Sequence, residues 1–180
     1  QPNNIKYEDF LKIDENTNEY LEFINGKIYN MASPSLIHQM ILTKLSTFFG
    51  VYFDGKDCFH INSPFDIVLK NDREINKVQP DLTVICDKKG LNDKNYEGTP
   101  DLIIEVLSPS STSRDFVTKM DLYMRFGVKE YWIISPDKKQ VYVYNFENNI
   151  LKSEPLTIRE NELLKSNIFD GLEIDLSKIF

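Results

Sequence analysis

Two stretches of the chain, QPDLTVICDKKG (79–90) and TPDLIIEVLSPSS (99–111), each place a Pro-Asp pair directly before a short apolar run. Asp81 opens the first run, Asp101 opens the second, and Glu105 lies inside the second. Both runs predict buried strands, and the second is apolar on both faces, which indicates a central position in a sheet. Because a buried carboxylate is costly unless a cation compensates it, these acids are either paired structurally or gathered on a metal ion.

The bulk composition is that of one globular domain over residues 1–180, with 41% hydrophobic and 27% charged residues. The formal net charge of −7 argues against a protein that coats nucleic acid by charge alone. It leaves room for an enzyme that uses a local basic patch around an acidic metal site. No apolar stretch is long enough to cross a bilayer, so no membrane partner is expected.

The chain has two cysteines, Cys58 and Cys86. Cys86 lies in an apolar run, where it is expected to be a small core residue. Neither cysteine belongs to a C-x-x-C or Cys/His cluster, so no structural zinc site is expected. Two isolated cysteines suit a reducing compartment, and the first ten residues lack the pattern of a secretory signal. The sequence therefore predicts a cytoplasmic protein.

Hydrophobic periodicity divides the chain into alternating helices and strands. Asn25-Gly26, between apolar and aromatic residues, predicts a two-residue hairpin turn within 19–31. Polar runs at 70–79 and 87–100 are expected to be exposed loops. The remaining expected elements are helices at 7–13, 33–53 and 114–126, strands at 58–62, 65–69, 82–86 and 101–107, a hairpin of 130–135 with 140–146, and short strand-like pieces in 150–180. This order predicts an α/β (α+β) fold with a mixed sheet.

Side-chain alternation in 101–107 surrounds Glu105 with apolar residues on both faces of its strand. From this strand alone, pairing with an arginine or lysine explains Glu105 as well as metal coordination does. For Asp101, the preferred interpretation is a turn residue at the start of its strand. Asp81 and Glu105, presented by neighbouring strands, would suit a Mg²⁺ ion, with Mn²⁺ as a substitute. The backbone carbonyl of Val106 is a candidate for a further oxygen ligand.

Pro80-Asp81 followed by Glu105-Val106-Leu107 resembles the PD-(D/E)-x-K nuclease pattern, although Leu107 stands at the lysine position. The match extends in order through YLEFINGKIYNMASPSLIHQ, QPDLTVICD, TPDLIIEVLSPSS, RDFVTKMDLYMRFGVKEYWIISP and VYVY, covering 19–146. In these segments the chain resembles the Uma2 family, also called DUF820, of restriction-endonuclease-like proteins. It departs from the family at Ser135 and Asn25, where aspartate is common. The resemblance implies a restriction-endonuclease-like core, with a mixed sheet flanked by helices.

The resemblance also implies roles for particular residues. Asp81 and Glu105 would be metal ligands, and Lys119, on the following helix, would replace the lysine missing at Leu107. Glu22 would be an additional acid near the metal, although without the resemblance the preferred interpretation of its place in the hairpin is a solvent-facing strand residue. The implied activity is Mg²⁺-dependent hydrolysis of phosphodiester bonds by an endonuclease, with DNA as the expected nucleic-acid partner.

Other residues carry weaker signals. His38 is expected to be structural or at the surface, although its place in the family-like stretch would suit a pocket mouth. Arg114, Arg125 and Lys129 are candidates for phosphate contacts. Tyr123 is expected in the core or an interface.

Three functions remain open at this point. The first is a DNA endonuclease, for which a homodimer would supply one site for each strand. The second is a catalytically inactive nucleic-acid-binding or regulatory module on the same fold, because a fold is inherited more securely than an activity. The third is metal-dependent hydrolysis of RNA or another phosphoester. The joint presence of Glu22, Asp81, Glu105 and Lys119 favours an active site.

Overall fold

The computed structural model describes residues 4–108 and 114–180. Most of SPSSTS (108–113), which the sequence favours as the capped start of the helix expected at 114–126, therefore lies outside the described residues. Helices and strands alternate along the chain, as predicted. The helical segments are α1 (Tyr7–Glu15), α2 (Leu36–Phe53), the π-helix η1 (Arg114–Lys119), α3 (Met120–Arg125) and the 3₁₀-helix η2 (Leu176–Lys178). The strands are β1 (Leu21–Ile24), β2 (Lys27–Asn30), β3 (Phe59–Asn62), β4 (Asp66–Lys70), β5 (Ile75–Val78), β6 (Leu82–Ile85), β7 (Asn95–Glu97), β8 (Leu102–Val106), β9 (Glu130–Ser135), β10 (Gln140–Glu147), β11 (Ile150–Leu151), β12 (Leu156–Arg159), β13 (Leu163–Lys165) and β14 (Glu173–Asp175).

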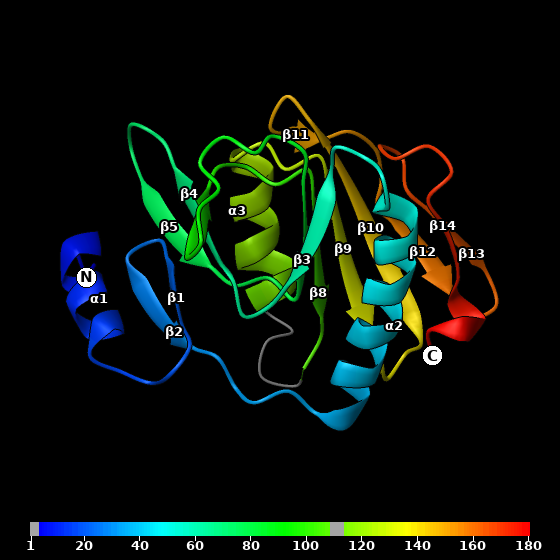
Figure 1. The fold of residues 1–180 in the computed structure, drawn as a ribbon, viewed down its shortest axis with the longest axis horizontal. Coiled ribbons are helices and arrows are strands. Elements are labelled where there is room, and N and C mark those ends of the chain that lie inside the picture. Colours follow the sequence, from blue (N-terminus) through cyan, green and yellow to red (C-terminus); the bar gives the residue numbers. More distant parts are fainter. Residues whose placement is uncertain (1–3, 109–113) are drawn as a thin grey trace.

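Most strands belong to two sheets (Figure 1). The smaller has the order β2-β1-β5-β4-β7, and the larger has the path β11-β10-β9-β8-β6-β3, with β12 also paired to β10. In the larger sheet β8 is antiparallel to β6 and parallel to β9, so the sheet is mixed. The mixed sheet and the central position of β8 confirm the predicted α+β fold class.

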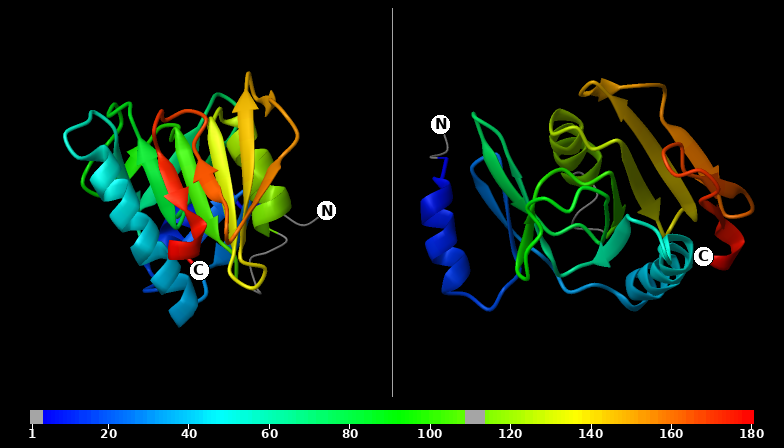
Figure 2. Two further views of the ribbon diagram at one scale, coloured as in Figure 1. Left: turned by 90° about the vertical axis from the view of Figure 1, so that its right-hand side faces the viewer. Right: turned by 45° about the horizontal axis from the view of Figure 1, so that its top comes forward.

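The helices cover the sheets in layers (Figure 2). α1 lies outside the β1–β2 hairpin, where Phe10 packs against Leu21 and Phe23. A second apolar cluster, which includes residues of β4, β6, β8, β9 and α3, fills the space between the two sheets. A third cluster lies where α2 and the C-terminal segment cover the other face of the larger sheet. Residues that face the second cluster from both sheets are therefore able to meet.

α2 follows the helical spacing in its sequence. Ser35 caps it by accepting a hydrogen bond from the backbone N–H of His38 at 3.3 Å. Ile41, Leu45 and Phe49 are buried against the larger sheet, while Leu36 and Val51 face solvent. Among residues 4–108 and 114–180, no helix combines the length and the apolar character needed to cross a membrane.

The first hairpin forms as predicted around Asn25 and Gly26, whose φ angles of 52° and 75° suit a tight two-residue turn. Alternation along β1 directs Leu21 and Phe23 toward α1. Glu22 points the other way, into the space between the sheets, and is 0% exposed. The alternative interpretation of Glu22 as a solvent-facing residue is therefore wrong.

The segment 70–79 is not the exposed loop that its polarity predicts, because it contains β5 between β1 and β4. Lys77 is buried in this strand, and its ammonium lies 2.7 Å from Asp14 of α1 and 3.1 Å from Asp66 of β4. Asn76 is also buried and accepts a hydrogen bond from the N–H of Asn25 at 2.8 Å. The polar side chains of β5 are compensated by distant partners, which is why local polarity misplaced the strand.

The segment 87–100, also predicted as a loop, contains the short strand β7. β7 lies within the connection between β6 and β8, and it pairs with β4 of the smaller sheet. Its Tyr96 is buried in the cluster between the sheets. The connection therefore ties the two sheets together, although most of its residues are polar.

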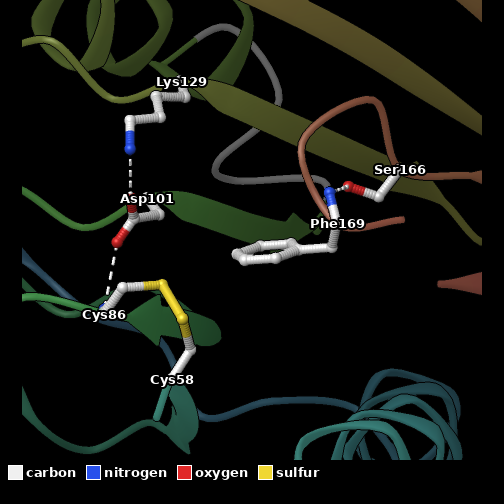
Figure 3. The surroundings of a disulfide bond; sticks show 6 residues. All are labelled: Cys58, Cys86, Asp101, Lys129, Ser166 and Phe169. Carbon is white, nitrogen blue, oxygen red and sulfur yellow. Dashed lines mark hydrogen bonds and ion pairs between the residues drawn. A yellow bond between two sulfur atoms is a disulfide. The ribbon is translucent and has the colours of Figure 1, made fainter. Parts of the chain in front are cut away.

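The two cysteines form a disulfide, so the prediction of isolated thiols is wrong (Figure 3). Cys58 precedes β3 and Cys86 follows β6, one step beyond the Phe59–Ile85 pair of these antiparallel strands. The N–H of Cys86 donates to Asp101 at 3.0 Å, and Asp101 also pairs with Lys129 at 2.6 Å (Figure 3). The register of β3 against β6 brings the two sulfurs together. The spacing of the cysteines in the sequence does not predict this pairing. The disulfide also removes the cysteine-based argument for a reducing compartment.

Candidate functional site

A cavity of about 310 Å³ lies where the two sheets face each other. Its wall contains Glu22, Asp81, Glu105 and Lys119, the four residues that the sequence singled out. Each of them is at least nine-tenths buried. Residues from β1, the start of β6, β8 and η1 therefore converge on one cavity, although they are up to 97 positions apart in the sequence (22 to 119).

Strand pairing brings Asp81 and Glu105 together. In the antiparallel β6–β8 ladder Leu82 lies opposite Ile104, so the next position places Asp81 opposite Glu105. Directly opposed residues point to the same face, which here is the face toward the smaller sheet. The N–H of Val106 donates to Asp81 Oδ2 at 2.7 Å and holds this carboxylate at the start of its strand.

Glu22 reaches the same place from the smaller sheet. Its Oε1 accepts a hydrogen bond from the N–H of Gln79, which follows β5, at 3.1 Å. Its Oε2 is buried and accepts no hydrogen bond within the described part of the chain. Arg114 Nε lies 3.9 Å from this oxygen. One oxygen of Glu22 thus remains able to accept a donor or a cation.

Lys119 connects the two sheets. Its ammonium lies 2.8 Å from Glu22 Oε1, 2.8 Å from Glu105 Oε1 and 3.8 Å from Asp115 Oδ1. Burial lowers the pKa of Lys119, but Glu105, Glu22 and Asp115 raise it by more, so the net pKa shift is upward. Lys119 is therefore a fixed positive charge between two glutamates from different sheets.

The π-helix η1 supplies both Lys119 and Asp115 to the cavity. Segments of π-helix are rare and occur often at functional sites, because they redirect side chains within a helix. Asp115 was not among the predicted site residues. Its position four residues before Lys119 is the only sequence signal that would have suggested the contact.

Glu105 receives two donors on one oxygen. Its Oε1 accepts from Lys119 at 2.8 Å and from the hydroxyl of Tyr123 at 3.0 Å. Burial raises the pKa of the Glu105 carboxyl well above its usual range, the Lys119 charge opposes that rise, and the nearby acids Asp115, Asp81 and Glu22 add to it. Tyr123 is a core residue, as predicted, and it also fixes the orientation of Glu105.

His38 contacts Asp81 from the first turn of α2. Its Nε2 lies 3.1 Å from Asp81 Oδ2. Because an ionised carboxylate only accepts hydrogen bonds, Nε2 carries the proton in this contact. Burial lowers the pKa of His38, but the hydrogen bond and charge of Asp81 outweigh that effect and raise it overall. His38 lines the cavity, as its place in the family-like stretch suggested.

The charge balance of the cavity fits a divalent cation. Four carboxylates, from Glu22, Asp81, Glu105 and Asp115, lie with two side-chain cations, Lys119 and Arg114, in the cavity wall. Counted as formal charges, this set has an excess of two negative charges. Within residues 4–108 and 114–180, no three His, Cys, Asp or Glu side chains are arranged to enclose an ion. Mg²⁺ keeps several waters and takes one or two carboxylates from a protein, so Asp81 and Glu105 could hold it without a third protein carboxylate.

The other candidate residues lie elsewhere. Asp101, the second Pro-Asp, is half-buried just before β8, where it accepts a hydrogen bond from the N–H of Cys86 and does not line the cavity. Lys129 pairs with Asp101, and Arg125 pairs with Asp121 at 2.9 Å and contacts Glu74. Of the three cations proposed for phosphate contacts, only Arg114 lines the cavity.

The chain is similar to known proteins in both sequence and fold. Residues 7–177 match the Uma2 family, which is described as "Putative restriction endonuclease". The uncharacterized protein slr1290 of Synechocystis is 32% identical over 139 residues, which is 77% of this chain and 72% of that protein. A crystal structure from Anabaena variabilis, titled as a putative nuclease belonging to DUF820, superposes with a TM-score of 0.80 at 20% identity, over 98% of this chain and 97% of that one. The superposition confirms the predicted nuclease-like fold, and the family match shows that this chain belongs to the Uma2 family.

Proposed function

We propose that this protein is a metal-dependent endonuclease that hydrolyses phosphodiester bonds, with DNA as its substrate. The observation that carries the proposal is the convergence of Glu22, Asp81, Glu105 and Lys119 in one buried, acid-rich cavity. Burying the carboxylates of Glu22, Asp81, Glu105 and Asp115 is costly, and buried acids gathered in a cavity with a cation favour a functional site. The family description, a restriction endonuclease, points to the same chemistry.

Asp81 and Glu105 would hold Mg²⁺ or Mn²⁺, together with the backbone carbonyl of Val106. When bound, the ion supplies Lewis acidity and a bound water of lowered pKa. Lys119 would neutralise negative charge that develops on the phosphate in the transition state. Glu22, held by the N–H of Gln79, positions the ammonium of Lys119.

Arg114 would bind a phosphate oxygen at the edge of the cavity. It is partly exposed, and its guanidinium lies over the ring of Tyr29 at 5.0 Å from the ring centroid. A guanidinium held in this way loses little further freedom when it binds an anion. Cutting both strands of a duplex would require two such sites, which a homodimer would supply; size-exclusion chromatography with and without DNA tests this extension.

The proposal is tested by incubating the purified protein with Mg²⁺ or Mn²⁺ and with double-stranded DNA, single-stranded DNA and RNA. Metal-dependent cleavage is expected, and both Asp81→Asn and Glu105→Gln should abolish it. Asp101→Asn is the matched control, because it alters the other Pro-Asp, which does not line the cavity. Cleavage that continues at the wild-type rate in both site variants would contradict the proposed site. Absence of both cleavage and metal binding would favour a binding module on this fold.

We expect His38→Ala to weaken Mn²⁺ binding about 10- to 100-fold, as is typical when a residue that orients a metal ligand is lost. The physical reason is that His38 and the N–H of Val106 both bind Asp81 Oδ2, which fixes the carboxylate plane. Electron paramagnetic resonance titration of free Mn²⁺ measures the affinity without any turnover. His60→Ala is the matched control, since His60 bonds Ser46 and does not line the cavity. Equal Mn²⁺ affinities in the two variants would show that His38 does not position Asp81.

A further inference from the structure

We propose that the cavity contains a subsite for an unpaired nucleobase, formed by Tyr20 and Met31 beside Glu22. This inference rests on the proposed nuclease function and names the substrate class of the same site. It implies that the protein acts on single-stranded nucleic acid, or on a nucleotide that has left its duplex. The unpaired base, which DNA and RNA share, is the chemical group that the subsite recognises.

The register of the first hairpin places the two residues. Leu21 pairs with Asn30, and the N–H of Met31 donates to the carbonyl of Tyr20 at 3.0 Å, so the ladder continues one step further. Tyr20 and Glu22 are two positions apart and therefore share a face of the hairpin. Both Tyr20 and Met31 line the cavity, on the same wall as Glu22.

The wall changes from apolar to acidic with depth. Tyr20 is 55% exposed at the cavity mouth, whereas Glu22 is 0% exposed. Ala32, Pro34 and Pro64 also line the cavity and are exposed, so the exposed part of its lining, its rim, includes apolar residues. An exposed aromatic ring is a stacking surface for a base, and a thioether packs readily against aromatic rings. A base on this rim would leave its phosphate free to reach the acids and Lys119.

The electrostatics of the cavity favour base recognition over duplex recognition. A protein that binds duplex DNA through its backbone neutralises several phosphates with lysine and arginine. In the described part of the cavity wall the lysine and arginine side chains are Lys119 and Arg114, and both lie near Glu22. The chain as a whole has a net charge of −7. Binders of single strands also use positive charge, but base–aromatic stacking adds about 1–3 kcal/mol per base, and it requires a base that is not already stacked in a duplex.

The test compares binding and cleavage of one sequence as single-stranded DNA, duplex DNA and single-stranded RNA. Fluorescence anisotropy of labelled oligonucleotides in EDTA gives binding without turnover, and gel assays in Mg²⁺ give cleavage. The wild type should bind and cut single strands better than the duplex. Tyr20→Ala should lose roughly ten-fold or more in single-strand affinity, as expected for one lost base–aromatic stack. Comparison of the DNA and RNA arms then identifies which source of unpaired bases is preferred.

Three further variants separate stacking from other effects. Tyr20→Phe keeps the ring and should retain wild-type affinity, whereas Tyr20→Leu keeps apolar area without the ring and should not. Leu156→Ala, an exposed apolar residue of β12 outside the cavity, is the control and should behave as the wild type. Because Tyr20 is exposed, its variants should unfold at the wild-type temperature, which a thermal melt verifies.

Three results would overturn the inference, and they differ in what they say about the proposed function. If Tyr20→Ala binds and cuts every substrate as the wild type does, while Glu105→Gln remains inactive, the nuclease function stands and the base subsite is wrong. If the wild type neither binds nor cuts any nucleic acid, both the subsite and the nuclease function are wrong. Equal wild-type affinity for single strands and duplex would also overturn the subsite.

Discussion

Replacing Lys119 with methionine is expected to lower cleavage about 100- to 1000-fold and, at the same time, to raise the affinity for Mn²⁺. The first effect follows because one preorganised donor to a transition-state anion contributes about that much to the rate. The second follows because the ammonium lies 2.8 Å from both Glu22 and Glu105. It neutralises carboxylates that a metal would otherwise use, so its removal leaves a more negative cavity.

Stability provides an independent readout of the same variant. Removing one partner from a buried ion pair typically costs about 3–5 kcal/mol, because the remaining charges are left uncompensated. Lys119→Met should therefore melt at a lower temperature without metal, and Mn²⁺ should raise that temperature by more than it does in the wild type. Mn²⁺ titration, thermal melts and cleavage assays measure the three quantities. Lys129→Met is the control, since Lys129 pairs with Asp101 outside the cavity. Weaker Mn²⁺ binding in Lys119→Met would contradict the proposed competition.

Removing the disulfide is expected to lower the free energy of unfolding by about 3–4 kcal/mol, the loop-closure value for the 28-residue separation of Cys58 and Cys86. The bond restricts the unfolded chain and joins the ends of β3 and β6. Urea unfolding of the double variant Cys58→Ala/Cys86→Ala measures the loss.

The wild type in a reducing agent should approach the same unfolding midpoint as the double variant. The double variant itself should show no response to the reducing agent, which controls for other effects of the reagent. A wild-type midpoint that equals that of the double variant under oxidising conditions would show that the disulfide contributes nothing to stability.

The sequence predicted correctly those helices, strands and turns that are marked by apolar periodicity or by turn residues within a short segment. Examples are the strands at 82–86 and 101–107, the Asn25-Gly26 hairpin and the α2 helix. In each of them the apolar spacing or the turn residues lie close together in the sequence. β5 was missed because Lys77 and Asn76 are compensated by residues far along the chain. The disulfide was missed for a related reason, since the pairing of β3 with β6 brings the cysteines together. Long-range partners decide these cases, and no local window contains them.

The site residues also divide into those that local sequence pattern predicts and those that it does not. Asp81 and Glu105 stood out because acids at strand positions are unusual, and strand pairing now places them on one face. Lys119 and Glu22 were identified only through the family resemblance, because nothing local distinguishes them from ordinary surface residues. The contact of His38 with Asp81 and that of Tyr123 with Glu105 cross between elements, so their geometry required the fold. The catalytic roles of these residues remain predictions, which the variants above test.

The position of Lys119 between two sheets would couple the proposed metal binding to motion of one sheet against the other. Glu22 belongs to the smaller sheet and Glu105 to the larger one, and the ammonium bridges them at equal distances. A shift of one sheet against the other changes the separation of these carboxylates, and with it the affinity for a cation. A nucleic acid that contacts both sheets would therefore change metal affinity. By thermodynamic reciprocity the metal would change nucleic-acid affinity by the same factor.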